Sequence, residues 1–497
     1  MEGISIKWPL LLFSILLGTA LGTQAQTTDD VLRYSLEYPA YDAVSIVMPG
    51  IGSHTGFGAY QDNPASMALA KGGYLSFHLS SRYVDESGRY LGTTTDFSDS
   101  QTGVGDLGLV YKFPTTRGSL VIGGGYSQSS TFNRALSVNA LNEKSTITDF
   151  YNSSFASDAL YFTAYDAFAI YDPSPGDDSY ESTTSAFRAN RYQGIYQNME
   201  LTERGQLGEY SAFIATEVME NFFLGATIGL TSGQYSYERD FLESDRDNVY
   251  TNTSNNTDID DILSLDTIDA DIEAFNAQLG AIYQVSDQFN VGLSYEFPSR
   301  LRITEKFNTV ISTSFDNGDV EEADDPAEFT YDIVRPSRLK GGITYSNLKG
   351  LTVSVMAEGV FYSDAEYDTD CNSVSNPSEC RKSIIDFNND IQATFSDVVN
   401  FRGGLEYQIN EQFTPRVGYA YYASPTDGFD RSRQYVSGGF SAQVSQIISI
   451  DLGVQYGFWD DQNTLYEYEL PSGEVGAERA GEEVRKLNVM AGIKVLL

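Results

Sequence analysis

Residues able to perform acid–base or nucleophilic chemistry are rare in this sequence of 497 residues, which contains only 2 His and 2 Cys. Neither His54 nor His78 has a plausible Ser, Asp or Cys partner nearby in the sequence, and no G-x-S-x-G nucleophile motif is present. The run Gly123-Gly124-Gly125 follows no phosphate-loop pattern. We therefore expect a protein that is not an enzyme.

Acidic residues far outnumber basic ones, with 69 Asp and Glu against 31 Lys and Arg and a net charge of −38. This balance repels phosphate backbones and excludes a nucleic-acid partner. The acidic segments 258–261 and 319–325 lack the spacing, turn glycine and closing Glu of an EF-hand loop. We expect no resident metal and no cofactor, and at most weak surface binding of divalent cations.

The only two cysteines, Cys371 and Cys380, lie in one polar stretch that contains Asn376-Pro377. Two cysteines without a nearby His make a poor zinc site. In an exported protein they are expected to form a disulfide that closes a loop.

The first 25 residues have the organisation of a secretory signal peptide. Lys7 precedes the apolar run 8–21, and Thr23-Gln24-Ala25 is a small-x-small cleavage signal. The alternative is a membrane-anchoring helix, but the apolar run is short for a bilayer core of ~30 Å. We assign residues 1–25 to the signal peptide and expect export.

Tyr, Phe and Gly are abundant, at 34, 29 and 44 residues, which favours strands over helices. In segment 74–83 the apolar Leu75, Phe77 and Leu79 alternate with Ser76, His78 and Ser80. The same alternation recurs in segments 106–113, 210–218, 224–230, 279–283, 291–295, 353–357, 401–407, 417–421, 450–456 and 487–495. Segments of about ten residues with this pattern are typical of transmembrane β-barrels.

A soluble β-sandwich shows the same alternation, so the connections decide between the two folds. Short turns alternate with long acidic loops, and aromatic residues repeatedly mark the strand ends, as in outer-membrane barrels. Counting strands between the connections gives about 14 in an all-β, antiparallel transmembrane barrel over residues 73–497. Residues 26–72 are rich in glycine and lack alternation, which predicts a plug (hatch) on the periplasmic side of the lumen.

Four motifs, in order, resemble the outer-membrane transporter family for fatty acids and hydrocarbons, the FadL type. They are residues 55–68 with Asn63-Pro64-Ala65, residues 203–226, residues 416–431 and residues 450–456. The resemblance covers essentially the whole chain after the signal peptide. It implies uptake by plug movement and a lateral opening in the barrel wall.

The resemblance also implies site residues. Asn63, Pro64 and Ala65 are expected to contact the ligand route, with an ordinary turn as the alternative. Arg239 fits, within one residue, the position whose Arg meets the polar head of a bound amphiphile. The alternative is a salt bridge to Glu238 or Asp240.

Two further ligand contacts are expected from the residues themselves. His78 and Arg82 share the polar face of the first strand, where they line the pore or only pair with neighbouring carboxylates. Gly123, Gly124 and Gly125 leave no side chains to fill the wall. We expect them at the lateral opening, which the family forms by a kink in its third strand. The alternative is that they only make room for the plug.

The leading functional hypothesis is therefore an outer-membrane channel for passive uptake of hydrophobic or amphipathic small molecules, such as long-chain fatty acids or hydrocarbons. A binding or scaffold barrel that serves secretion or surface assembly is the first alternative. A general polar porin is the second, although the glycine-rich plug argues against it. We expect a monomer in the outer membrane of a Gram-negative cell, with membrane lipid and an apolar ligand as partners.

Overall fold

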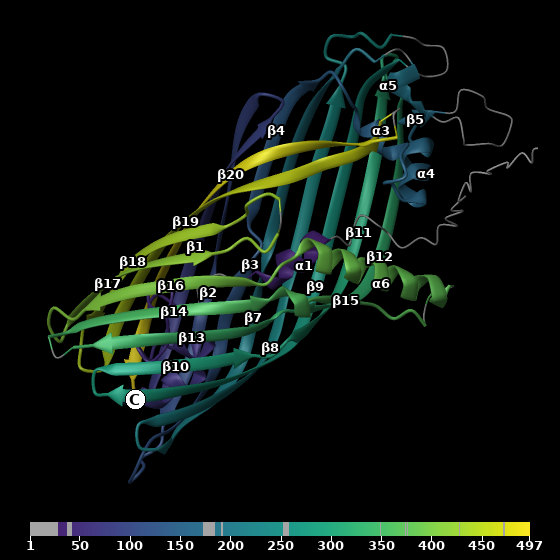
Figure 1. Ribbon diagram of the computed structural model, residues 1–497. Helices are drawn as coiled ribbons and strands as arrows, with labels where there is room; N and C mark the ends of the chain where they lie inside the picture. The colour runs from purple at the N-terminus through teal and green to yellow at the C-terminus, as the bar shows by residue number, and fades with distance from the viewer. Residues whose placement is uncertain are drawn as a thin grey trace, which may run out of the picture.

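The computed structural model describes residues 28–36, 42–171, 184–189, 192–251, 258–347, 349–372, 374, 376–426, 428–470 and 473–497. The expected signal peptide, residues 1–25, lies outside the described residues. Antiparallel sheet dominates the described part of the chain (Figure 1).

One sheet of 18 strands closes on itself, because β1 pairs with both β2 and β20. The strands are β1 (Tyr74–Tyr90), β2 (Thr93–Lys112), β3 (Leu120–Thr131), β4 (Arg134–Asn142), β7 (Ile195–Met219), β8 (Phe222–Ser244), β9 (Ile259–Ser286), β10 (Phe289–Glu296), β11 (Ser299–Phe315), β12 (Val320–Arg335), β13 (Ser337–Ser346), β14 (Leu351–Phe361), β15 (Glu366–Asp368), β16 (Val398–Tyr407), β17 (Phe413–Tyr422), β18 (Arg433–Gln443), β19 (Ile448–Glu469) and β20 (Val475–Leu496).

Four strands of the barrel are each interrupted once, so that two segments share the same neighbours. β3 and β4 both pair with β7, and β10 and β11 both pair with β9. β13 and β12 continue one another, as do β14 and β15. The 18 segments therefore form 14 barrel strands, which confirms the predicted barrel.

The alternation of residue types separates the outer face of the wall from the lumen. Leu75, Phe77 and Leu79 of β1 are 40–48% exposed, whereas Ser76 and His78 between them are 3% exposed. An apolar exterior suits contact with lipid, and polar side chains face inward. Among the described residues, none of the helices is both long and apolar enough to cross a membrane.

Three neighbouring strands are interrupted at the same level of the barrel. Phe297-Pro298 separates β10 from β11, Pro336 separates β13 from β12, and a 3-10 helix, η3 (Tyr362–Asp364), separates β14 from β15. Proline lacks the N–H group that a ladder needs. Beyond this line, which we call the crease, β11 and β12 turn upward from the direction of β10 and β13 (Figure 1).

The plug lies inside the barrel and is almost completely buried. It contains α2 (Ala59–Asp62) and a 3-10 helix, η1 (Pro64–Leu69), which packs on β7, β8 and β9. Phe57 and Tyr60 are at most 1% exposed and pack on Phe213 of the wall. The N-terminal plug inside the barrel is thus as predicted.

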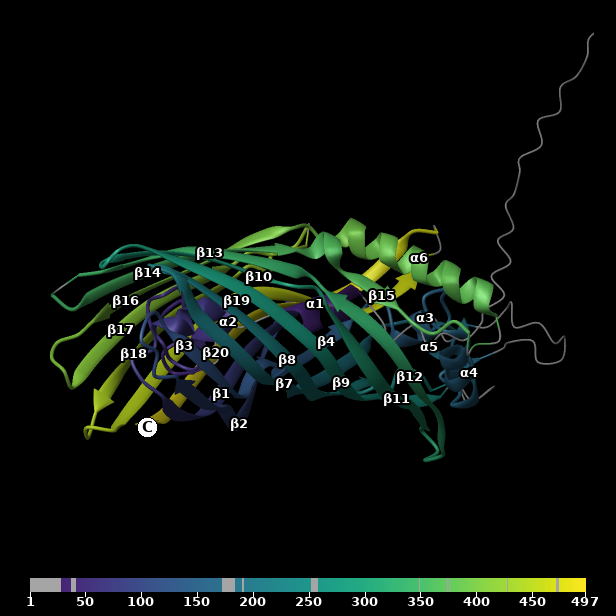
Figure 2. The same ribbon diagram turned by 90° about the horizontal axis from the view of Figure 1, so that it is seen from below.

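Apart from the N-terminal helix and the plug helix α2, the α-helices lie towards the end of the barrel opposite the C-terminus (Figures 1 and 2). We call this the long-loop end and the other the short-turn end. It carries α3 (Ile147–Tyr151), α4 (Asp158–Asp166), α5 (Ala186–Ala189), α6 (Pro377–Thr394) and the small sheet β5 (Ile170–Tyr171) with β6 (Thr184–Ser185).

The N-terminal helix, α1 (Thr28–Ser35), packs within a core of barrel side chains and against α6. Its Val31 is 0% exposed and shares this core with Ile391 of α6. The disulfide predicted between Cys371 and Cys380 is present, with a Cα–Cα distance of 5.6 Å. It closes the loop that leads into α6.

Candidate functional site

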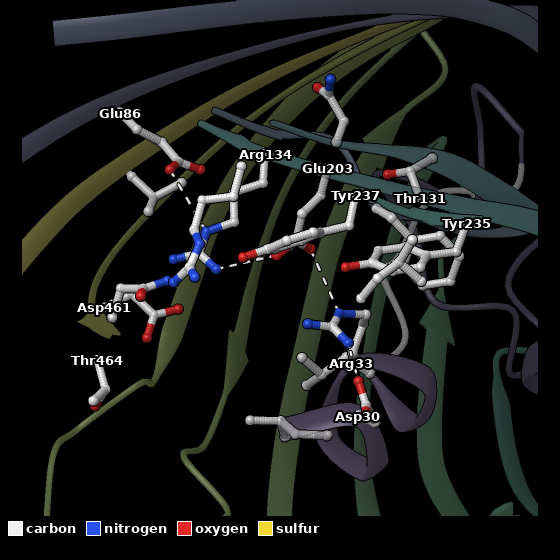
Figure 3. A pocket seen from close by; sticks show the side chains of 18 of the residues that line it. Asp30, Arg33, Glu86, Thr131, Arg134, Glu203, Tyr235, Tyr237, Asp461 and Thr464 are labelled. Carbon is white, nitrogen blue, oxygen red and sulfur yellow. Dashed lines mark hydrogen bonds and ion pairs between the residues drawn. The ribbon is translucent and has the colours of Figure 1, made fainter. Parts of the chain in front are cut away.

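A cavity of about 350 Å³ occupies the lumen between the plug and the long-loop end, and we call it the lumen cavity (Figure 3). Strands from most of the barrel circumference and α1 contribute to its lining. Its aromatic residues are Phe132, Tyr235, Tyr237, Phe307 and Trp459. Its charged residues are Asp30, Arg33, Glu86, Arg134, Glu203, Arg239, Asp266, Arg431, Arg433, Asp461 and Lys486.

Arg134 is the centre of an ion-pair network on one wall of the lumen cavity. Its guanidinium lies 3.2 Å from Glu203 Oε1, 2.5 Å from Glu482 Oε1 and 3.8 Å from Glu86 Oε2. The Glu86 and Glu482 side chains are at most 2% exposed. Buried carboxylates of this kind are tolerated only when they are paired. Arg134 therefore compensates the negative charges of three carboxylates, which lie on β1, β7 and β20.

The same network continues to the N-terminal helix. Arg33 Nε lies 3.5 Å from Glu203 Oε2, and Arg33 also pairs with Asp30 of α1. The Arg33 guanidinium stacks over the Tyr235 ring at 4.7 Å from its centroid. Figure 3 shows these side chains and Arg134 converging on the cavity from α1, β4, β7 and β8. The network thus fixes α1 to the wall and leaves the aromatic rings as the apolar surface.

Arg239, the residue expected to meet a polar head group, lines the lumen cavity. Its Nη2 and Nε donate to Asp266 Oδ2 at 2.6 and 2.9 Å, and its Nη1 donates to the Leu465 carbonyl at 3.1 Å. The partner is thus Asp266 on β9 rather than the neighbouring Glu238 or Asp240 considered from the sequence. The side chain is 13% exposed, so it reaches the cavity surface with a preformed carboxylate partner.

Asn63, Pro64 and Ala65 lie where the plug meets the wall, away from the lumen cavity. Asn63 accepts from the Ala65 N–H at 3.0 Å and donates to the Ala281 and Leu293 carbonyls at 3.1 and 3.2 Å. The wall offers glycines here: a Cβ at Gly225 would lie 2.4 Å from the Ala65 nitrogen. The observed contacts are those of a plug anchor, and the ligand contact stays a prediction.

His78 faces a second cavity, of about 210 Å³, at the short-turn end of the plug. Its Nδ1 lies 2.6 Å from Asp106 Oδ2. Asp42, Arg416, Asp451 and Lys494 also line this cavity. The surroundings of His78 are therefore strongly charged, and it is not brought together with Arg239.

Asp42 ties down the start of the plug. Its carboxylate accepts from the N–H groups of Val44, Ser45 and Gly58 at 2.6–2.7 Å and is 0% exposed. Burial by itself raises the pKa of this carboxyl. The nearby imidazoles of His78 and His54, with the backbone N–H donors, lower the pKa below its ordinary value.

Arg82 lies on the same strand as His78 but borders a different space, a cavity of about 20 Å³ that we call the kink cavity. Its guanidinium donates to the Gln128 amide oxygen, and Gln128 Nε2 donates to Gln206 Oε1 at 2.9 Å. Thr131 and Lys486 line both the kink cavity and the lumen cavity. Arg82 is thus adjacent to the lumen cavity without lining it.

Gly123, Gly124 and Gly125 lie in an intact part of the wall. They pair with residues 108–110 of β2 and residues 211–213 of β7. The β2–β3 ladder ends at the pair Asp106 and Ser127, only two residues further on. A register shift follows between Gln128 and Ser130. The wall is therefore irregular just beyond the glycines rather than at them.

Beyond the end of this ladder, β2 and β7 approach one another through side chains. Arg204 Nε lies 3.1 Å from Asp99 Oδ2, which also accepts from Asn133 Nδ2 at 2.8 Å. A Cβ at Gly103 would lie 3.3 Å from Gln206 Oε1. Residues 130–133 of the third barrel strand are all buried behind this contact. We call this irregular stretch, residues 128–133, the kink.

Arg33, Arg134 and the carboxylates around them were not predicted from the sequence. A signal was present, because Glu86, Glu203 and Glu482 continue the inward-facing side of the alternation beyond the apolar segments. The partners are far apart in the sequence, at 134, 203 and 482, so their pairing depends on barrel closure. Within the described ranges, no group of three or more His, Cys, Asp and Glu residues is arranged to hold a metal ion.

Comparisons with known proteins agree with this architecture. The family model described as "Outer membrane protein transport protein (OMPP1/FadL/TodX)" matches residues 189–483. The toluene transporter TodX of Pseudomonas putida shares 14% identity at a TM-score of 0.51, over 93% of this chain and 99% of that chain. A FadL homologue of Pseudomonas aeruginosa shares 12% identity at a TM-score of 0.53, over 92% and 97%.

At identities this low, the similarity to these two structures shows a common fold and nothing more. No curated protein sequence matches the chain. The family model, however, covers more than half of the sequence. The chain therefore belongs to the outer membrane protein transport family that includes FadL and TodX.

Proposed function

We propose that this outer-membrane protein is a channel for passive uptake of hydrophobic or amphipathic small molecules. The observation that carries the proposal is the lumen cavity, which combines an aromatic surface with a few fixed polar groups. Its volume of about 350 Å³ is in the range of small-molecule sites, ~300–1,000 Å³. The toluene transporter TodX has the same fold, which supports an apolar ligand of similar kind.

The charges of the lumen cavity narrow the ligand class. Arg33, Arg134 and Arg239 each have carboxylate partners within the protein. A neutral hydrocarbon needs only the aromatic surface, whereas a fatty acid must share Arg239 with Asp266. We propose that the cavity accepts hydrocarbons directly, and long-chain fatty acids through Arg239.

The ligand leaves sideways through the wall at the kink. The alternative route, from the plug to the short-turn end, passes the cavity lined by charged groups such as Asp42, Arg416 and Lys494. Returning apolar surface to a polar route costs ~25 cal/mol per Å². Thr131 instead lines both the lumen cavity and the kink cavity. Gln128, which also lines the kink cavity, directly follows Ser127, where the β2–β3 ladder ends.

At about 20 Å³ the kink cavity is too small for a ligand, so this exit is closed here. Opening requires the hydrogen bonds of Gln128 to Arg82 and Gln206 to break. We propose that movement of the plug and of the third barrel strand provides this opening. Gly123, Gly124 and Gly125 then lie at its base. The barrel closes on itself, and we propose that it acts as a monomer surrounded by membrane lipid.

Trp459 lines the lumen cavity and provides a direct test. The only other tryptophan, Trp8, lies in the expected signal peptide. Bromotoluene should quench the Trp459 fluorescence of the purified protein saturably, because a bound bromine lies near the indole ring. Excess toluene should reverse the quenching. A linear, non-competable response would contradict binding in the cavity and would favour a scaffold barrel.

A further inference from the structure

A groove of about 560 Å³ lies on the outer face of the wall, at the crease. We propose that this groove binds a phosphate-bearing glycolipid of the outer leaflet. Its lining includes Arg300 and Arg302 of β11 just beyond the crease, with Tyr210 of β7 and Leu230 of β8 on the other side. The site faces the membrane and is separate from the lumen cavity.

Two guanidinium groups are held side by side at the polar edge of the groove. Asp332 accepts from Arg300 Nη1 at 3.1 Å and from Arg302 Nε at 3.3 Å. The Asp332 side chain is 13% exposed, whereas those of Arg300 and Arg302 are 52% and 68% exposed. One carboxylate thus orients two arginines whose side chains stay more than half exposed. Planar guanidinium groups suit the oxygens of a phosphate.

The other edge of the groove is apolar and marks the limit of the lipid-facing surface. Tyr210 is 61% and Leu230 is 60% exposed. Phe275 of β9, which is paired with Leu230, is 57% exposed, and Leu279 of the same outward row is 51% exposed. On the other side of Phe275 this row becomes acidic with Glu273. A lipid therefore places its acyl chains on the apolar row and its head group at the two arginines.

The crease explains why a concave surface exists on a barrel exterior. Pro298 and Pro336 interrupt adjacent strands, and β11 and β12 turn away from the line of β10 and β13 (Figure 1). Arg300 lies two residues beyond Pro298 and lines the groove together with Tyr210 and Leu230. Arg300 also pairs with Asp368 at 2.9 Å, and Glu273 lines the groove. The carboxylates of Asp368 and Glu273 suit a phosphorylated head group, because a divalent cation can bridge a phosphate and a carboxylate.

Native mass spectrometry of the full-length protein in detergent, titrated with diphosphoryl lipid A, tests the site. The double variant R300Q/R302Q should bind about 30-fold more weakly, because each basic side chain near an anionic lipid contributes roughly fivefold. Lipid A without phosphates should bind the wild type about as weakly as the double variant binds the diphosphoryl form. R300K/R302K, which keeps the charge, should lose less than the glutamine variant.

A matched control is available on the other side of the barrel. Arg89 of β1 and Arg485 of β20 are 62% and 61% exposed and share Glu483 as a partner, on an uninterrupted ladder. R89Q/R485Q removes the same charge without altering the crease and should bind lipid A like the wild type. Unchanged binding by R300Q/R302Q, equal loss in the control, or equal binding of dephosphorylated lipid A would each overturn the proposal.

Discussion

At the scale of single residues, the proposed function assigns the response to a charged ligand to the balance between Arg239 and Asp266. The two side chains hold one another at 2.6 Å, so a carboxylate ligand competes with Asp266 for the same guanidinium. R239Q should lower the initial uptake rate of a long-chain fatty acid about 10- to 100-fold, since a hydrogen bond to a charged group contributes roughly 1.5–3 kcal/mol. Uptake of toluene should not change.

The reciprocal variant separates this role from a purely structural one. Asp266 also accepts from Thr309 Oγ1 at 2.6 Å, and an amide at this position can keep that bond. D266N should therefore raise the affinity for a fatty acid while leaving toluene uptake unchanged. If both variants reduce the uptake of both compounds equally, Arg239 only supports the barrel.

Asp42 is the second residue whose role can be measured, because it anchors the plug through three N–H groups. Folding lowers the pKa of this carboxyl, so its stabilising contribution is complete above the ordinary pKa of ~3.9 and is lost as the pH falls through the lower folded value. D42N should expose the amides of Ser45 and Gly58 to hydrogen exchange about 10- to 100-fold faster at neutral pH, for a loss of roughly 1.5–3 kcal/mol. Exchange as slow as in the wild type would show that other contacts hold this segment.

At the scale of elements, α6 and its disulfide define the long-loop end. The closed loop between Cys371 and Cys380 is expected to be external, because the short turns at the other end are expected to face the periplasm. After mild reduction, a membrane-impermeant maleimide should label both thiols on intact cells. Labelling only after permeabilisation of the outer membrane would reverse the orientation. C371S/C380S should give no signal in either case.

The strands themselves could be predicted from local sequence, whereas their interruptions could not. The alternation of Leu75, Phe77 and Leu79 with polar neighbours is a property of one segment, and it predicted both the strand and its outer face. The crease depends on Pro298 and Pro336 lying at the same level of adjacent strands, which only the register reveals. The kink depends on where the β2–β3 ladder ends, two residues beyond Gly125.

The candidate site was predictable only in part, because local sequence reveals single residues but not contacts between distant strands. Arg239 could be singled out because its immediate sequence fits a family motif within one residue, and the structure places it in the lining of the lumen cavity. The network of Arg134 with Glu203 and Glu482 joins residues far apart in the chain. The position of α1 beside this network depends on its packing against several strands at once. The sequence of any one segment does not reveal this packing.

At the scale of the whole molecule, the plug favours the proposed ligand-specific channel over an open porin. Plug side chains fill the lumen at this level. Tyr60 stacks on Phe213 of the wall, and glycines of the wall let the plug approach closely. Deleting residues 27–60 should raise the single-channel conductance in planar bilayers strongly. An unchanged conductance would show that this segment does not block the bore. Heat-modifiable gel mobility checks that the barrel is still closed.

The central claim is that an apolar ligand passes from the lumen cavity to the wall through the kink. Ser130 lines the kink cavity, is 7% exposed, and its hydroxyl has no hydrogen-bond partner among the described residues. The most direct measurement is the initial rate of radiolabelled toluene uptake by cells that express S130F, with S98F on the exposed face of β2 as the matched control. We predict that S130F abolishes uptake while Trp459 quenching by bromotoluene persists, and that S98F behaves like the wild type. Wild-type uptake by a correctly folded S130F protein would contradict passage through the kink.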